Sequence, residues 1–463
     1  MLRISNQYVK LLISKEGEKY FGALQLNGKT LNVESDFDID ISKYENQALE
    51  CFMDGKDLVY DNHFIKKYDN VFAKDTILDL YVKDGIGTIY FGDYPVESFE
   101  CDLNREHYKV NVNTDEDYTI VRYANLHQHT ENSLLDGIAR ISDLSEKCEY
   151  ACAITDHGNM YGWYDMLNAF NKKGKKAIIG EEFYIETFKG PRPILPKDLT
   201  VQTEDELMFD NSKEQNEEGL NGEHLIVLAK NNQGIKNLFW LSSQASLHFY
   251  RKGHITFEEL KSHSEGLIVC SACLAGGLSQ FVKEYLKAKE LPEVREWIDN
   301  YGETFYLDPV YHTGTFECDV YAHNHQKARE YIEWFKEVFD NDFYIEYQDH
   351  HFPLENLVMN EIVRIRNEEY PEIKIVATCD AHYLNKEDAY VHELWLCNQT
   401  KRTIDDPKHM KFSGDGYYVH TSNEMLEQFP VEFLDNTLEI EEKIHYDEIN
   451  KGYHLPHFPL PKG

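Results

Sequence analysis

Short apolar runs recur along the chain from residue 123 onward, and most of them stop at a residue that can bind metal. The runs are rich in β-branched residues and are separated by segments with helical periodicity, which is typical of βα units around a parallel sheet or barrel. In such folds the functional side chains come from the carboxyl ends of the strands and the loops that follow them. The runs that end in His, Asp, Glu or Cys span residues 123–129, 152–157, 177–182, 266–273, 342–350 and 373–382.

Two of these runs end in a pair of metal-binding residues: His127 with His129, and Asp380 with His382. Residues i and i+2 of a strand point to the same face, so each pair can aim at one point. A surface strand also carries His-x-His by chance, but the recurrence of such strand ends favours a metal site. His224 fits less well, because it precedes the apolar run 225–229 and would lie at the opposite end of a barrel strand. The pattern alone leaves the role of His224 open.

Several motifs surround these residues and follow one another in a fixed order. They include Leu-His-Gln-His-Thr at 126–130, Ile-Thr-Asp-His-Gly-Asn-Met-Tyr-Gly at 154–162, Ile-Ile-Gly-Glu-Glu at 178–182 and Thr-Cys-Asp-Ala-His-Tyr-Leu-Asn-Lys-Glu-Asp at 378–388. In this order they resemble the PHP (polymerase and histidinol phosphatase) domain, in the version found at the amino terminus of bacterial DNA polymerase III alpha subunits. The resemblance covers about residues 120 to 463.

The resemblance implies a distorted (β/α)7 barrel with up to three metals at its mouth. It also implies that His224 is a ligand, and it prefers Glu182 to Glu181, because the acidic ligand of the family stands two residues after the glycine. All nine implied positions hold a residue able to bind metal, which favours a working site. The implied ligands are His127, His129, Asp136, His157, Glu182, His224, Cys273, Asp380 and His382.

This ligand set mixes nitrogen, oxygen and sulfur donors. Such a mixture suits Zn or Mn, with Fe as a third option, better than Mg or Ca. We therefore expect two to three divalent metals. The expected catalytic group is a water held by these metals, and no separate protein base is assigned.

Within the polymerase branch, the resemblance implies a metal-dependent phosphoesterase, and specifically a 3′–5′ exonuclease of the proofreading type. Two alternatives stay open. One is a small-molecule phosphomonoesterase of the histidinol-phosphatase type, and the other is a catalytically silent scaffold that stabilises a polymerase. The expected partners are a single-stranded DNA 3′ end and a polymerase catalytic region or other replication proteins.

The formal charge of −35 argues against strong autonomous binding of DNA, because nucleic-acid binders usually carry basic patches. We therefore expect a larger polymerase to present the DNA. Nine cysteines without framework spacing predict a reducing cytoplasm. No apolar stretch approaches the roughly 18 residues needed to span a bilayer, so no membrane partner is expected. Cys148, Cys152, Cys270 and Cys379 are predicted to be core residues.

Three regions divide the sequence. Residues 1–118 alternate short apolar runs with turn signals and predict a small acidic β-rich domain of unknown role. Residues 119–450 would form the barrel, with insertions near 187–222 and 302–326. Residues 451–463 resemble a linker toward a polymerase thumb and palm, which this chain does not contain. The chain is thus expected to be a fragment of an alpha subunit or a separate PHP protein, and a phage origin is a hypothesis.

Overall fold

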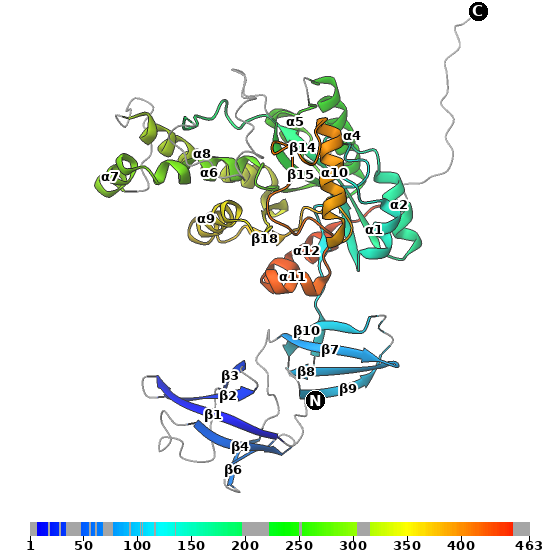
Figure 1. Ribbon diagram of the computed structural model, residues 1–463, viewed down its shortest axis with the longest axis vertical. Helices are drawn as coiled ribbons and strands as arrows, with labels where there is room; N and C mark the ends of the chain where they lie inside the picture. The colour runs from blue at the N-terminus through cyan, green and yellow to red at the C-terminus, as the bar shows by residue number, and fades with distance from the viewer. Residues whose placement is uncertain are drawn as a thin grey trace, which may run out of the picture. The chain divides into compact units, whose positions relative to one another are not determined.

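The computed structural model describes residues 7–16, 19–26, 29–33, 48–54, 57–60, 63–67, 77–91, 94–101, 103, 105–114, 117–134, 136–196, 222–249, 252–302 and 315–447. The chain divides into two compact units, Met1–Val121 and Arg122–Gly463 (Figure 1). The predicted linker at 451–463 and parts of both predicted insertions, 197–221 and 303–314, lie outside the described residues. No helix in the described ranges is long and apolar enough to cross a membrane.

The first unit consists of two antiparallel sheets, so the prediction of a β-rich region is confirmed. Two predicted turns are hairpins: Leu26 pairs with Lys29 and Lys83 pairs with Ile86. Asp84 and Gly85 both have positive φ in the second turn, as a two-residue hairpin requires. The first sheet has the order β3-β2-β1-β4-β5-β6 and the second β11-β10-β7-β8-β9. The strands are β1 (Gln7–Glu16), β2 (Lys19–Leu26), β3 (Lys29–Val33), β4 (Ala48–Asp54), β5 (Asp57–Tyr60), β6 (His63–Lys67), β7 (Ile77–Lys83), β8 (Ile86–Phe91), β9 (Tyr94–Glu100), β10 (His107–Thr114) and β11 (Asp117–Ile120).

The second unit is built on one seven-stranded sheet with the order β12-β13-β14-β15-β16-β17-β18. The sheet curls, and a bridge between Gln128 and Ala381 joins the segments that follow its first and last strands. The predicted (β/α)7 barrel is therefore confirmed. Its strands are β12 (Ala124–Asn125), β13 (Ala151–Ile154), β14 (Lys176–Ile185), β15 (Glu223–Ala229), β16 (Leu267–Cys270), β17 (Phe343–Tyr347) and β18 (Lys374–Ala377).

One strand runs against the others. β15 pairs antiparallel with both β14 and β16, whereas the remaining neighbours pair in parallel. The start of β15 therefore lies at the same end of the barrel as the carboxyl ends of the other strands. β14 also runs further than the sequence suggested: it continues past Glu182 to Ile185, and this extension pairs with the start of β15.

Helices connect the strands and cover the barrel. They are α1 (Ile141–Lys147), α2 (Trp163–Lys172), α4 (Asn232–Leu247), α5 (Phe257–Ser262), α6 (Gly277–Lys289), α7 (Pro292–Tyr301), α8 (Phe316–Phe339), α9 (Pro353–Glu369), α10 (Ala389–Thr400), α11 (Ser422–Gln428) and α12 (Val431–Lys443), with short 3-10 turns η4 (Asp340–Asp342) and η5 (Lys386–Asp388). Residues 316–326, in the second predicted insertion, form the first half of α8.

The barrel interior is a packed core to which every strand of the sheet contributes. Ile440 and Ile444, in α12 and just after it, join this core. Lys176 at the start of β14 donates to the Glu441 carbonyl, and the Tyr446 hydroxyl donates to Ala229 at the end of β15. α12 and the residues after it thus close the end of the barrel opposite the strand ends that carry the predicted ligands. The four cysteines predicted to be core residues are all buried: Cys148, Cys152, Cys270 and Cys379.

We expect Thr437→Val to lower the free energy of unfolding by about 1–3 kcal/mol, because it would leave a buried backbone donor unpaired. The Thr437 hydroxyl accepts a hydrogen bond from the Ala124 amide at 2.9 Å, which connects α12 to β12. Denaturant unfolding measures the change. Thr437→Ser, which keeps the hydroxyl and loses one methyl, should cost about 1 kcal/mol. A serine variant less stable than the valine variant would contradict this account.

Candidate metal centre

The two predicted strand-end pairs meet at the mouth of the barrel. His127 Nε2 and His129 Nε2 lie 3.2 Å apart, and Asp380 Oδ1 lies 3.0 and 3.1 Å from them. The bridge between Gln128 and Ala381 sets this arrangement, because it aligns the two segments so that their alternate residues face inward. Asp380 adopts a φ of +42°, which is uncommon for a residue with a side chain. Such strain is typical of functional sites.

Glu182 lies between these residues and a second set. Its Oε2 is 3.3 Å from His129 Nε2 and 2.7 Å from His157 Nδ1, and its Oε1 is 2.9 Å from His224 Nδ1. β14 can pack closely against β15 here because residue 180 is glycine: an added Cβ would lie 2.6 Å from Leu228 Cδ2. Glu181, one position earlier, belongs to the other face of the strand. The structure thus brings Glu182, and not Glu181, among the imidazoles.

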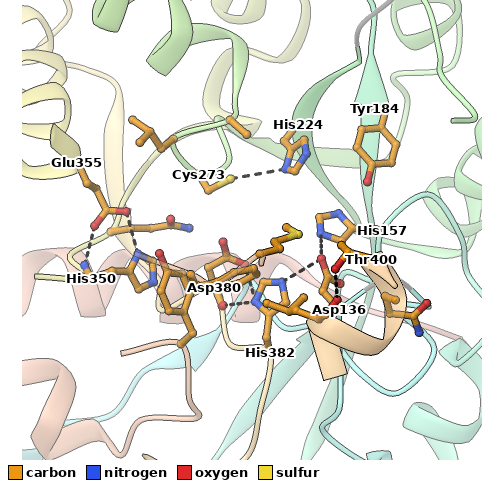
Figure 2. A pocket seen from close by; sticks show the side chains of 18 of the residues that line it. Asp136, His157, Tyr184, His224, Cys273, His350, Glu355, Asp380, His382 and Thr400 are labelled. Carbon is orange, nitrogen blue, oxygen red and sulfur yellow. Dashed lines mark hydrogen bonds and ion pairs between the residues drawn. The ribbon is translucent and has the colours of Figure 1, made fainter. Parts of the chain in front are cut away.

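The direction of β15 brings His224 to the mouth. His224 precedes its apolar run, so a parallel strand would place it at the closed end of the barrel. Because β15 is antiparallel to its neighbours, His224 lies at the open end instead. Glu182 pairs with Ile226, so His224 lies two residues along the same face. Cys273 Sγ is 3.6 Å from His224 Nδ1 (Figure 2).

A further group contains Asp136, His157 and His382. Asp136 Oδ2 lies 3.1 Å from His157 Nε2 and 3.7 Å from His382 Nε2 (Figure 2). All nine predicted ligands therefore converge on one region. Within it, ligand atoms lie close enough to share an ion in three sets: His129 with Asp136, His157 and His382; His127 with His129 and Glu182; and His157 with Glu182 and His224.

These residues fit a set of metal ions better than a hydrogen-bonded network. Both oxygens of Glu182, Asp380 Oδ1 and His382 Nε2 are buried without a hydrogen bond among the described residues. Buried polar atoms without partners are rare and need an explanation. Two ligand atoms about 2.1 Å from a shared tetrahedral ion would lie about 3.4 Å apart, which is close to the spacings in this cluster.

The electrostatics of the cluster favour bound cations. Burial opposes ionisation of Glu182, but the imidazoles of His224 and His157 hold its pKa well below the usual value. Burial likewise opposes the charged form of His127, yet Asp380 and Glu346 raise its pKa well above the usual value. The carboxylates are thus ready to take a cation. Protons on the imidazoles would compete with metal, so metal affinity should rise with pH.

Buried partners orient the imidazoles. His127 Nδ1 lies 2.6 Å from Glu346 Oε1, His129 Nδ1 lies 3.1 Å from Ser133 Oγ, and His382 Nδ1 lies 2.8 Å from the Asp380 carbonyl. Each contact turns the opposite nitrogen toward the cluster. Glu346 was not predicted from the sequence, where the available signal was an acidic residue inside the apolar run of β17. His350 lies behind Asp380, with its Nε2 3.0 Å from the Cys379 carbonyl.

The cluster opens into a cavity of about 270 Å³. α10 and the segment after it contribute apolar side chains, including Leu396, Met410 and Phe412. Phe412 packs edge-on against His382 with ring centroids 4.8 Å apart. Tyr184 and Lys252 line the cavity beside His224. Six of the nine predicted ligands line this cavity and can meet a small ligand there: Asp136, His157, His224, Cys273, Asp380 and His382.

Comparisons with known proteins agree with this geometry. Residues 125–350 match the family described as the PHP domain. The chain is 32% identical over 360 residues to DNA polymerase III subunit alpha of Thermus aquaticus, covering 74% of this chain and 24% of that protein. It is also 32% identical over 344 residues to the same subunit of Campylobacter jejuni, covering 72% of this chain and 24% of that protein.

The chain spans about a quarter of the length of these relatives. A solved structure of a protein from Bifidobacterium adolescentis, provisionally described as a metal-dependent phosphoesterase, is also similar. The match has 12% sequence identity and a TM-score of 0.23, and covers 56% of this chain and 88% of the other.

The barrel is thus a PHP domain. Its sequence relates it to the PHP domains of bacterial DNA polymerase III alpha subunits, as the motifs indicated.

We expect Glu346→Gln to weaken metal binding by about 10–100-fold, because an outer carboxylate fixes the orientation and basicity of its histidine. Competition with a chelator of known affinity measures the change. Glu361→Gln is the control: it removes the ion pair that Glu361 makes with Arg364 in α9, and it should bind metal normally. Unchanged affinity in Glu346→Gln would contradict the assigned role.

We also expect added Mn²⁺ or Zn²⁺ to stabilise the protein, by about 2.7 kcal/mol at a free concentration 100 times the dissociation constant. Glu182→Gln should lose most of this stabilisation, since its oxygens reach two of the three ligand sets. The unfolding temperature of each protein, measured with and without added metal, tests both expectations. Glu181→Gln is a matched control, because it is equally buried but lies outside these sets. Equal loss in both variants would contradict a specific role for Glu182.

Proposed function

We propose that this PHP domain is a metal-dependent phosphoesterase that removes nucleotides from the 3′ end of single-stranded DNA in the service of a replicative polymerase. The observation that carries the proposal is the arrangement of three adjacent ligand sets, two of which share Glu182, beside an open cavity that six of the nine predicted ligands line. We propose two to three bound ions, of Zn or Mn, with Fe as a third option.

Divalent ions held by these residues would supply an activated water and would offset the charge of the phosphoester. The protein side chains hold and orient the ligands and shape the cavity. Glu346 and Ser133 fix the imidazoles of His127 and His129. The apolar wall that includes Met410 and Phe412 offers a surface against which the sugar or base of a terminal nucleotide can pack.

The relation to polymerase alpha subunits supports DNA as the substrate. The formal charge of −35 supports a division of labour in which another part of the replication machinery presents the strand. Only the last nucleotide would then need to enter the cavity, whose volume of about 270 Å³ suits a small group.

The same small volume favours a second candidate function, hydrolysis of a small phosphomonoester as in histidinol phosphatases. A third, a silent scaffold for a polymerase, would need the fold but not ligand atoms beside a cavity. Activity on the two substrate classes distinguishes these candidates.

The decisive experiment is metal-dependent degradation of a 3′-labelled single-stranded oligonucleotide, alongside a generic phosphomonoester. We expect laddering from the 3′ end, and we expect an Asp380→Asn, His382→Ala double variant to lose at least about 100-fold in rate, because metal ions contribute several kcal/mol to such reactions. The exposed Asp405→Asn variant is the control. Turnover of the monoester alone would favour the phosphatase. Absence of turnover on both substrates, with metal bound, would favour the scaffold.

A further inference from the structure

Among the described residues that line the cavity, Lys252 is the one lysine or arginine. The other charged groups of the lining include the carboxylates of Asp136, Glu355 and Asp380. The cavity is therefore acidic apart from the metals it would hold and this single ammonium group. An anionic substrate would meet repulsion from the chain everywhere except at these positive charges.

The backbone beside Lys252 is tied to the strand that carries Glu182. Ile255 bridges to Ile185, its amide donates to the Tyr184 carbonyl at 2.9 Å, and its carbonyl accepts from Glu186 at 3.0 Å. A capping box between Thr256 and Glu259 then starts α5. Lys252 thus extends from a segment that is hydrogen-bonded on both sides of Ile185, next to Tyr184.

The ammonium lies close to the ligand sets. Lys252 Nζ is 4.3 Å from the centroid of the Tyr184 ring. The same ring packs against two candidate ligands, with centroids 5.8 Å from His157 and 5.1 Å from His224. The ammonium and the two imidazoles therefore contact the same aromatic ring, which places the positive charge close to the candidate ligands.

Lys252 has no carboxylate within 4 Å in the described part of the chain. Other basic residues of the barrel do have one: Lys230 pairs with Asp342, Lys176 with Glu441 and Arg192 with Glu223. In a sequence with 82 acidic and 47 basic residues, a lysine at the site without such a partner is available to an incoming anion. Contact with a tyrosine ring alone holds an ammonium group only weakly at an exposed site.

We propose that Lys252 binds a non-bridging phosphate oxygen of the substrate and so sets the affinity of the site for phosphoesters. The inference rests on the proposed phosphoesterase function and names a substrate-binding residue for it. Lysine acts as a point charge with three rotatable donors, so it places few demands on the geometry of the ester. Tyr184 acts as a positioning residue that holds the ammonium beside the ligand sets.

The test compares Lys252→Gln and Lys252→Arg with the wild type and with Lys236→Gln, which removes an exposed lysine on α4. Binding of inorganic phosphate to the metal-loaded protein is measured by calorimetry, together with metal content and the unfolding midpoint. We expect Lys252→Gln to weaken phosphate binding about tenfold, equivalent to about 1.4 kcal/mol. Lys252→Arg should restore most of the affinity, and metal content and stability should not change.

A second readout uses whichever ester the protein hydrolyses. Lys252→Gln should raise KM more than it lowers kcat, and should reduce the slope of log KM against log salt concentration by about one for the oligonucleotide. Phosphate binding like that of the wild type in Lys252→Gln would overturn the proposal. So would weak binding accompanied by loss of metal, because the lysine would then be structural. Phosphate binding that depends on Lys252 in a protein that hydrolyses no ester would support this inference while the proposed function fails.

Discussion

The candidate metal centre depends on the pairing of the buried Glu182 carboxylate with the imidazoles around it. Glu182 is almost fully buried, at 1% exposure, and lies within ion-pair distance of His127, His129, His157 and His224. A buried charge is costly unless it is paired. Here the pairing groups are imidazoles, which are neutral when they bind metal, so the carboxylate needs either protons on its neighbours or cations between them. A cluster of this composition is stable as a metal site or as a protonated network, and the balance shifts toward metal as pH rises.

The fold makes this arrangement available through one reversed strand. In an all-parallel barrel, a residue that precedes its strand lies at the closed end. Because β15 is antiparallel to β14 and β16, His224 reaches the open end and faces Glu182 across a regular pairing. The extension of β14 past Glu182 supplies the pairing partner, and Tyr184 within it carries the contact with Lys252. One change of strand direction thus connects the imidazole of a candidate metal ligand, His224, with the wall of the cavity.

Much of the site was accessible from sequence because it follows local rules. Strand alternation predicted that His127 and His129 share a face, as do Asp380 and His382, and the polar ends of short apolar runs located the mouth of the barrel. The direction of β15 was not accessible, because an apolar run looks the same in either direction. Glu346 was missed for a related reason: a single acidic residue in a buried strand has meaning only once its cross-barrel neighbour is known. Lys252 lies in no sequence motif that would mark it as a site residue. It reaches the site because Ile255, three residues later, pairs with Ile185.

The strong negative charge of the chain sharpens the question of how such a site could accept a phosphoester. The chain has 82 acidic residues. At physiological ionic strength exposed charges are screened beyond about 8 Å, so an acidic side chain on the surface acts mainly on groups within that distance. Inside the cavity screening is weak, and the local charges decide. Bound divalent ions would reverse the sign of the floor, and the ammonium of Lys252 adds a positive group beside it. With metal bound, an acidic surface and a positive interior would admit an ester that is delivered to the mouth and would disfavour unguided binding along a DNA backbone.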